Sequence, residues 1–277
     1  MLKAGDSKRV AELMRETAAA ELLPRFRNLA KHEIREKKPG DLVTVADVAA
    51  EQRLASGLAK ILPGVPVVGE EAVHADPSLV DLIGRRGEAC WIVDPLDGTA
   101  NFAAGRDRFA IIVCLVRDTE TVGGWILDVP NDRMAAAEKG QGVTLDGLAV
   151  RGAIPDGRPN GLLGDRVQKE FQRQLNPAQR ERLGELTTLR CAGREYVEML
   201  AGRYSFCSYR MTKPWDHAAG ALMLAEAGGD AVRFDGTAYG PAGPMEGGII
   251  AASTREVLTE VRAVLEMVQM PLLAPQR

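Results

Sequence analysis

The sequence has few of the residues that hold zinc or form disulfide bonds. It contains four cysteines and three histidines in 277 residues; no two cysteines form a C-x-x-C pair, and the histidines do not cluster. This spacing argues against the common zinc sites. Because Cys90 and Cys114 lie in apolar runs, we expect buried thiols and a location in the reducing cytoplasm.

Long apolar runs and a large excess of one charge are also absent. No run of about 18 apolar residues occurs, so no membrane span is expected, and the polar residues 1–9 predict no secretory signal. A formal net charge of −3 gives no reason to expect nucleic acid or a membrane as a partner. What the chain has is 45% hydrophobic residues, enough for one large domain or two joined halves with a substantial core.

The order of apolar patterns predicts a mixed α and β fold. In the first part of the chain we expect a helix at 7–30, which Pro24 could kink or end, and a second helix at 44–62. We also expect a solvated helix end at 31–38, strands at 65–68, 109–116, 121–129 and 133–138, and a hairpin-like turn at 140–147. These strands form an antiparallel meander, which excludes a doubly wound parallel sheet.

A segment rich in proline, glycine and aspartate at 153–160 predicts a connection between two halves, residues 1–152 and 153–277, of one compact catalytic unit. In the second half we expect strands at 161–164, 187–191, 204–209, 231–234 and 248–252, and helices at 169–183, 194–201, 215–227 and 256–267.

The stretch 91–102 is the centre of the chain. A short apolar run ends in Asp94, and the strand is predicted to stop there because Pro95 cannot continue a central ladder. A turn after Asp94 would let the carboxylates of Asp94 and Asp97 converge with the carbonyl oxygen of Leu96. Such oxygens are the ligands that Mg²⁺ prefers.

Gly98 and Thr99 follow directly and favour a turn and a helix start. Their backbone N–H groups would lie at a helix N-terminus, where a phosphate oxygen binds well. Taken alone, the stretch has a plain structural explanation: a strand, a turn and a helix with an aspartate cap.

Three other acidic stretches also have plain explanations. Asp47 near the start of a helix is explained as a cap. Glu70 and Glu71 follow a short strand, as residues of a solvated loop do. Asp216 opens an apolar helix, where the helix dipole stabilises a carboxylate. All of these stretches together, in this order, are harder to explain as unrelated caps and loops.

The combined motifs resemble the inositol monophosphatase family of lithium-sensitive, Mg²⁺-dependent phosphatases, over nearly the whole chain. The matching stretches are Asp47, Gly69-Glu70-Glu71, Asp94-Pro95-Leu96-Asp97-Gly98-Thr99 and Trp215-Asp216-x-x-Ala219. The resemblance implies an α+β fold with a layered α-β-α-β-α arrangement, with the metal site between the halves. It also implies two or three Mg²⁺ ions, and a homodimer is common in the family.

The resemblance further implies metal ligands. Glu70, Asp94 and the Leu96 carbonyl would hold the first ion, and Asp94, Asp97 and Asp216 the second. Glu70 would also assist a weaker third ion. Most of these ligands fall in the first half of the chain, and Asp216 falls in the second.

The remaining site residues are also implied by the resemblance. Thr99, oriented by Asp47, would position or deprotonate the attacking water. Glu71 would contact the metal ligands and hold them in place without binding the metal itself. No covalent enzyme intermediate is needed. The expected substrate contacts are Asp97, Gly98, Thr99, Gly193, Arg194, Tyr209 and Asp216.

The substrate-recognition residues depart from the family pattern. Members that act on inositol phosphate usually have Gly-Thr/Ser-Ala-Ala and often a Glu seven residues before the Asp of the Trp-Asp motif. Here the first stretch is Cys191-Ala192-Gly193-Arg194-Glu195-Tyr196, and the second position is Tyr209. Arg194 or Arg210 could reach a second phosphate or be a solvated residue, and Tyr209 could stack on a base or sugar or fill core.

The sequence therefore predicts a Mg²⁺-dependent phosphomonoesterase acting on a small polyol or sugar phosphate such as inositol 1-phosphate. Histidinol phosphate, fructose 1,6-bisphosphate and 3′-phosphoadenosine 5′-phosphate are alternative substrates. A regulatory binding protein of the same fold is an alternative of another class. The spacing Asp94-x-x-Asp97 argues against a haloacid-dehalogenase-type nucleophile, which needs Asp-x-Asp.

Overall fold

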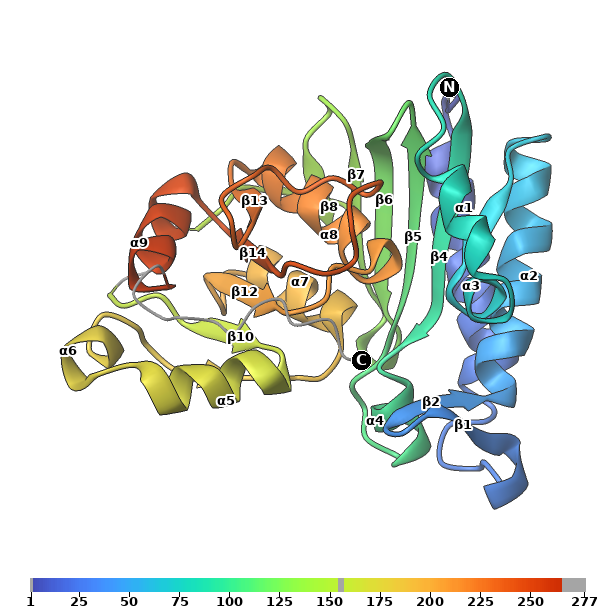
Figure 1. Cartoon of the computed structure of the whole chain (residues 1–277). Helices are drawn as coiled ribbons and strands as arrows, with labels where there is room; N and C mark the ends of the chain where they lie inside the picture. The colour runs from blue at the N-terminus through green and yellow to red at the C-terminus, as the bar shows by residue number, and fades with distance from the viewer. Residues whose placement is uncertain (1, 154–156, 266–277) are drawn as a thin grey trace.

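The computed structural model describes residues 2–153 and 157–265 and arranges them in alternating layers (Figure 1). Helices cover one face of a seven-stranded sheet, two helices lie between that sheet and a five-stranded sheet, and further helices cover the outer face of the second sheet. The predicted α+β class and the α-β-α-β-α order of layers are confirmed.

The first helical layer consists of α1 (Asp6–Thr17) and α2 (Val45–Ile61). The sheet behind it has the order β3-β4-β5-β6-β7-β8-β9 and is antiparallel except where β3 pairs with β4. Its strands are β3 (Val67–Gly69), β4 (Ala89–Asp97), β5 (Ala110–Arg117), β6 (Glu120–Asp128), β7 (Arg133–Glu138), β8 (Val143–Leu145) and β9 (Leu148–Val150). Helices cover both faces of the inner strand β5, which explains its unbroken apolar sequence.

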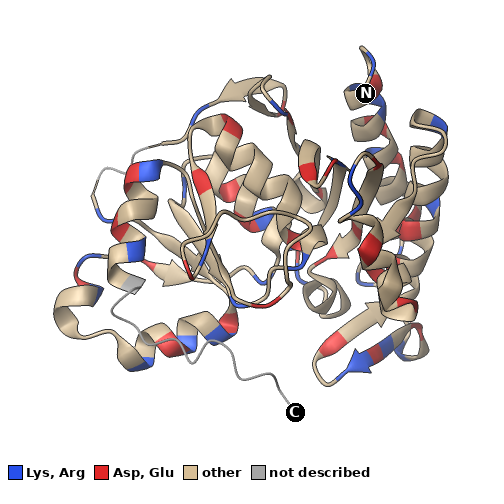
Figure 2. Cartoon of the chain, turned by 45° about the horizontal axis from the view of Figure 1, so that its top comes forward, with Lys and Arg blue, Asp and Glu red and all other residues tan. Residues whose placement is uncertain are grey.

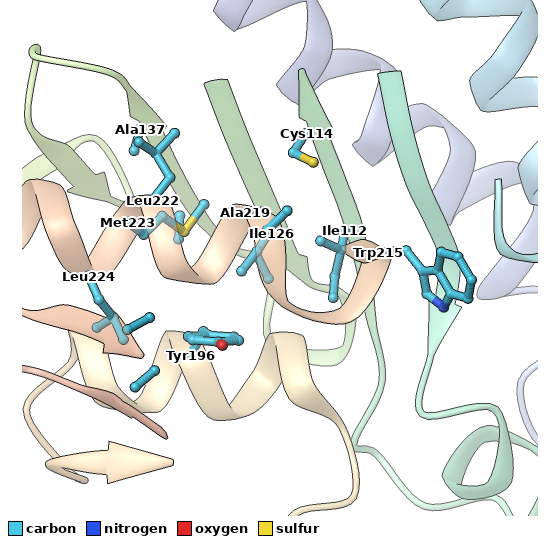
Figure 3. Packing of buried hydrophobic residues seen from close by; sticks show 14 of the residues in the cluster. Ile112, Cys114, Ile126, Ala137, Tyr196, Trp215, Ala219, Leu222, Met223 and Leu224 are labelled. Carbon is cyan, nitrogen blue, oxygen red and sulfur yellow. The ribbon is translucent and has the colours of Figure 1, made fainter. Parts of the chain in front are cut away.

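The middle layer consists of α7 (Ala192–Leu200) and α8 (Pro214–Ala227). Figure 3 shows Tyr196 of α7 and Ala219 of α8 near Ile112 and Ile126 of the first sheet. A Cβ atom at Gly220 would overlap the Tyr196 ring, so this glycine lets the two helices approach closely. Because neighbours surround α8, it is apolar almost all round, as its sequence indicated.

The second sheet is mixed, with the order β11-β10-β12-β14-β13. Its strands are β10 (Gly161–Leu163), β11 (Leu186–Thr187), β12 (Phe206–Tyr209), β13 (Asp230–Arg233) and β14 (Ile249–Ala252). The outer helices are α5 (Asp165–Gln174), α6 (Pro177–Arg180) and α9 (Arg255–Leu265). A separate apolar core that includes Phe171, Phe206 and Val261 joins this outer layer to the sheet.

Several predicted elements are corrected by the structure. Helix α1 is followed by a π-helical turn, Ala18–Leu22, and ends before Pro24. The predicted hairpin-like turn 140–147 contains strand β8. The predicted helix 169–183 is divided into α5 and α6, because Asn176 and Gln179 form a capping box that starts a new helix.

The segment 31–38 was predicted to be a solvated helix end, and this is wrong. Strand β1 (Ile34–Lys38) pairs antiparallel with β2 (Asp41–Thr44). Gly40, with a φ of 82°, closes the hairpin. The hairpin carries Lys37 inward, with only 4% of its side chain exposed.

Two predicted segments lie partly outside the described residues: the connection 153–160, at 154–156, and the last helix, beyond 265. Among the described residues, no helix is long and apolar enough to cross a membrane. Lys and Arg are interspersed with Asp and Glu over both halves in the view of Figure 2.

Candidate active site

Strand β4 ends in an irregular segment that carries two carboxylates. Asp94 pairs with Ile112 of β5 and Asp97 with Ala110, so three steps along β4 match two along β5. This is the geometry of a β-bulge. Pro95, which has no N–H to donate, lies inside it, so the strand continues to Asp97 and the prediction that it stops at Asp94 is wrong.

Gly98 connects β4 to the short helix α4 (Thr99–Ala103). Its φ of 86° lies in the left-handed region. A Cβ atom here would come within 2.7 Å of the carbonyl oxygen of Arg108. Glycine is therefore required at this turn.

The Thr99 hydroxyl lies between two oxygens. Its Oγ1 is 2.9 Å from Oδ1 of Asp47 and 2.9 Å from the carbonyl oxygen of Leu96. The other oxygen of Asp47, Oδ2, accepts hydrogen bonds from the backbone N–H of Thr44 at 2.7 Å and from its hydroxyl at 2.6 Å. Asp47 therefore caps α2 and also contacts Thr99.

Asp47 is 1% exposed. Burial raises the pKa of its carboxyl group to about 7, although hydrogen bonds from Thr44 and Thr99 act in the opposite direction. A carboxyl group with this pKa can exchange a proton near neutral pH.

Glu70 and Glu71 open helix α3 (Glu70–Ala75) and face two lysines. The Lys37 ammonium lies 3.4 Å from Oε1 of Glu70 and 2.9 Å from Oε1 of Glu71. The Lys213 ammonium lies 3.3 Å from the same oxygen of Glu70. Burial would raise the pKa of Glu70, but the charges of Lys213 and Lys37 outweigh it and the pKa is lowered.

Helix α3 is held at its N-terminus by Glu51 of α2. The two carboxylate oxygens of Glu51 accept hydrogen bonds from the backbone N–H groups of Glu71 and Ala72, each at 2.9 Å. Glu51 lies one helical turn after Asp47. The same face of α2 therefore positions both Thr99 and the segment that carries Glu70.

The N-terminus of α7 binds Asp97. Oδ2 of Asp97 accepts a hydrogen bond of 2.6 Å from the backbone N–H of Gly193 and one of 3.0 Å from the Cys191 thiol. A Cβ atom at Gly193 would come within 2.9 Å of the Cβ of Ala110. Gly193 is therefore buried against β5, and its amide is bound to Asp97 in this structure.

The acidic groups of the candidate site affect one another's pKa values through their charges. Burial, followed by the charges of Glu70, Asp97 and Asp216, raises the pKa of Asp94 well above its usual range. Burial also raises the pKa of Asp97, and it raises that of Asp216 to about 8 against the charge of Lys213. These charge interactions act between acidic groups of β4, α3 and α8, and the role of these groups as metal ligands stays a prediction.

The donor set suits Mg²⁺ in its chemistry, since it consists of carboxylate and carbonyl oxygens whose charges repel one another. As the side chains lie, no three or more His, Cys, Asp or Glu residues within 2–153 and 157–265 form a ready metal site. Glu70 is paired with lysines and Asp97 with Cys191 and Gly193. Metal binding therefore requires these side chains to exchange partners.

Arg194 is engaged in ion pairs. Its guanidinium lies 3.1 Å from Oδ1 of Asp128, which is fully buried, and 3.0 Å from Oε1 of Glu198. These contacts give Arg194 a structural role between α7 and β6. A contact with a second phosphate stays a prediction for Arg194, as it does for the partly exposed Arg210.

Tyr209 is partly exposed at the end of β12. Its ring centroid lies 4.7 Å from that of His217, and its hydroxyl donates a hydrogen bond to Glu195. A role in substrate contact stays a prediction.

Sequence reasoning did not identify Lys37, Lys213, Glu51 or Glu195. Two of them had a local signal: Glu51 lies four residues after Asp47 in a helix, and Lys213 lies three residues before Asp216. Lys37 and Glu195 reach their partners only through the packing of separate elements, so no local pattern identifies them.

The chain is similar to proteins of known family. The model of the inositol monophosphatase family matches residues 7–269. An inositol-1-monophosphatase of Rhizobium meliloti is 32% identical over 246 residues, covering 85% of this chain and 86% of that protein. Nus factor SuhB of Pseudomonas aeruginosa is 31% identical over 233 residues, covering 79% and 83%.

A solved structure of an IMPase from Thermotoga maritima has a TM-score of 0.76 at 25% identity, covering 93% of this chain and 97% of that one. The fold, the grouped acidic residues and the match of the family model along almost all of the sequence agree with one another. The chain belongs to the inositol monophosphatase family.

Proposed function

We propose that this chain is a Mg²⁺-dependent phosphomonoesterase that hydrolyses a small polyol or sugar phosphate such as inositol 1-phosphate. The observation that carries the proposal is the Thr99 hydroxyl, 2.9 Å from both Asp47 and the Leu96 carbonyl and directly after the carboxylates of β4. The family and the relative named an inositol-1-monophosphatase support the same reaction.

Five residues would hold two or three Mg²⁺ ions: Glu70, Asp94, Leu96 through its carbonyl, Asp97 and Asp216. Bound Mg²⁺ neutralises phosphoryl oxygens and lowers the pKa of water. The pKa values of the buried Asp94, Asp97 and Asp216 are raised, so bound Mg²⁺ would displace their protons and stabilise the carboxylate forms. Glu71 would keep Lys37 beside the cluster.

Thr99 and Asp47 would guide the attacking water. The Thr99 oxygen accepts a hydrogen bond from the water while its own proton is donated to Asp47, so the water's proton can pass to the Asp47 carboxylate. Attack of the water oxygen on phosphorus breaks the ester P–O bond. The leaving alkoxide would take up a proton from solvent water, and Asp47 would return the proton it received to solvent, so the products are an alcohol and inorganic phosphate.

Substrate would lie against the turn after β4. The backbone N–H groups of Gly98 and Thr99 suit a phosphate oxygen. Asp97 and Asp216 would lie beside this proposed phosphate position. Gly193, Arg194 and Tyr209 remain the proposed contacts on the side of α7 and β12.

A second candidate is a regulatory binding protein of the same fold. The relative named Nus factor SuhB, at 31% identity, favours it. This role does not depend on the carboxylates, so partner binding that survives Asp94→Asn would support it.

Asp94→Asn tests the phosphatase, because Asp94 is 2% exposed and feels the charges of three other carboxylates. We expect this variant to lose at least about 10³-fold in Mg²⁺-dependent phosphate release. The substrates to assay are inositol 1-phosphate, fructose 1,6-bisphosphate, histidinol phosphate and 3′-phosphoadenosine 5′-phosphate.

The exposed Asp132, which pairs with Arg15, provides the matched control Asp132→Asn. Near-normal turnover in Asp94→Asn would contradict the proposed ligand set. A wild-type protein that binds Mg²⁺ but hydrolyses none of the four substrates would favour the regulatory role.

A further inference from the structure

Lys37 is a buried cation that the proposed reaction does not use. It lies in the β1–β2 hairpin between Glu36 and Lys38, where the pairing register shifts. A bulge of this kind adds one residue to a strand and re-aims a side chain. Glu36 and Lys38 are exposed, whereas only 4% of the Lys37 side chain is. The register shift therefore turns one lysine of a charged strand inward.

Three carboxylates surround the Lys37 ammonium. Its Nζ lies 2.9 Å from Oε1 of Glu71, 3.4 Å from Oε1 of Glu70 and 3.8 Å from Oδ1 of Asp41. Burial would lower the pKa of Lys37, but the charges of these three groups and the hydrogen bond to Glu71 outweigh it, and the pKa is raised. Several carboxylate oxygens around one cation are also the surroundings that proteins give to a divalent ion.

The hairpin faces the candidate metal ligands. Lys37 contacts the same oxygen of Glu70, a proposed ligand, that Lys213 contacts. Burial is the main cause that raises the pKa of Asp216, and the charge of Asp41 adds to it. The charged groups of the hairpin therefore lie close enough to act on the proposed ligands of both halves of the chain.

The two lysines on Glu70 are held differently. Lys213 has 31% of its side chain exposed and, among the described residues, one ion pair, that with Glu70. Lys37 has 4% exposed and three ion pairs. An approaching Mg²⁺ can displace Lys213 into solvent. Displacing Lys37 would leave Glu71, whose side chain is 11% exposed, without its counter-charge, which is costly.

We propose that Lys37 is a tethered cation that takes the place of one divalent ion, so that the site holds two Mg²⁺ ions and not three. The inference rests on the proposed phosphatase function and fixes its number of ions. Lys37 neutralises Glu71 and part of the charge of Glu70, and a further divalent ion beside these glutamates would be repelled by its fixed positive charge. It is a positioning residue, since it acts through Glu70 and not on the substrate.

Titration with Mn²⁺ followed by electron paramagnetic resonance tests the proposal, because it counts bound ions without any substrate. Mn²⁺ takes the same oxygen ligands as Mg²⁺. The variants are Lys37→Ala, which frees the glutamates, and Lys37→Arg, which keeps the charge. Lys37→Gln removes the charge but can still donate a hydrogen bond to Glu71, and it replaces the alanine variant where that one does not fold. Lys38→Ala is the matched control, since Lys38 is the next residue of the hairpin and is exposed.

We expect two bound Mn²⁺ ions per chain in the wild type, in Lys37→Arg and in Lys38→Ala, and a third, weaker ion in Lys37→Ala. Without metal, the Tm of Lys37→Ala should lie roughly 5 °C below that of the wild type, because the glutamates lose their counter-charge. Saturating Mn²⁺ should remove most of this difference. Loss of a purely structural ion pair would lower the Tm but would add no ion.

Three bound ions in the wild type would overturn the proposal, whatever the variants show. So would an unchanged number of ions in a folded variant that lacks the charge of Lys37. Failure of the phosphatase itself is a different result, in which the wild type binds two Mn²⁺ ions but releases phosphate from none of the four substrates with Mg²⁺. Fewer than two bound ions in the wild type would contradict both the proposal and the ligand set.

Discussion

Thr99 contributes a single hydroxyl group, and the proposed reaction depends on it. Its oxygen lies 2.9 Å from Asp47 and from the Leu96 carbonyl. We expect Thr99→Ala to lower kcat by about 10²- to 10⁴-fold, the usual contribution of a positioned proton-transfer group. Thr99→Ser, which keeps a hydroxyl, should recover most of the rate.

Steady-state phosphate release at saturating Mg²⁺ measures this effect. Thr259→Ala is the control, because the Thr259 hydroxyl is also 2.9 Å from a carbonyl oxygen, that of Arg255, at an exposed position of α9. If Thr99→Ala and Thr259→Ala behaved alike, the water would have to be activated elsewhere.

Lys213 places a fixed positive charge where a metal ion would approach Glu70. Its ammonium lies 3.3 Å from Oε1 of Glu70 and 5.6 Å from the centre of the Trp215 ring. Since a divalent cation must displace it from Glu70, we expect Lys213→Met to lower the Kd for Mg²⁺ by roughly three- to tenfold. Methionine keeps the apolar stem over Trp215.

Titration calorimetry of Mg²⁺ binding, without substrate, measures the change. Lys139→Met is the control, because Lys139 pairs with the exposed Glu120. Weaker Mg²⁺ binding in Lys213→Met would mean that the lysine organises the ligands rather than competing for them.

The Glu51 carboxylate holds the N-terminus of helix α3 in place. Glu51 binds the N–H groups of Glu71 and Ala72, and α3 begins with Glu70. We expect Glu51→Gln to lower kcat roughly tenfold and to reduce stability by about 1 kcal/mol, since the amide can accept at only one end. Kinetics and thermal unfolding together measure both effects.

Glu226→Gln is a close control for this element. Glu226 also binds two backbone N–H groups, those of Gly140 and Gly142, at 2.7 and 2.8 Å, in a loop with no predicted site residue. It should lose similar stability and keep its kcat. Equal kinetic effects in the two variants would remove the positioning role of Glu51.

Local sequence signals identified boundaries of the main helices but not every strand. Thr44 and Asp47 form a capping box at α2, and Gly228 ends α8 with a φ of 102°, so both boundaries could be predicted. The charged residues 34–38 have no strand pattern of their own, and they become β1 only because β2 pairs with them. Pro95 suggested a strand end because a bulge cannot be seen in a sequence.

The same limit applies to the candidate site. The acidic candidates lie in short motifs, so the sequence alone could nominate them, and their roles stay predictions. Glu195 and Tyr209 are 14 residues apart and meet only when α7 packs against β12. Lys37 meets Glu70 across 33 residues through the β1–β2 hairpin. Contacts of this kind depend on tertiary packing, and no single stretch encodes them.

The layered fold sets the relative position of Asp97 and Asp216, the candidate ligands from the two halves of the chain. Asp97 lies on the first sheet and Asp216 on α8, and both helices of the middle layer pack against that sheet. A Cβ atom at Gly124 of β6 would come within 3.0 Å of Ala219, so α8 lies close against the sheet. The distance between the acidic groups is therefore set by core packing and not by surface loops.

This rigid framework brings carboxyl groups together at a cost in stability. Burial raises the pKa of Asp47 and of Glu195 to about 7 and that of Asp216 to about 8. Each group binds a proton more tightly in the folded chain than in the unfolded one, so its favourable contribution is present at low pH and is lost as the pH rises through the folded pKa. The loss begins near pH 4, the ordinary pKa of these carboxyl groups in the unfolded chain, and is complete near pH 8, the highest of the raised pKa values.

We therefore expect the Tm of the metal-free protein to fall by roughly 5 °C or more between pH 5 and pH 8. Mg²⁺ binds deprotonated carboxylates, so it should raise the Tm strongly at pH 8 and little at pH 5. Scanning calorimetry with a chelator or with Mg²⁺ measures both curves, and in Asp94→Asn the Mg²⁺ effect should be much smaller. A metal-free Tm that rises from pH 5 to pH 8 would mean that the acidic groups are solvated instead of crowded.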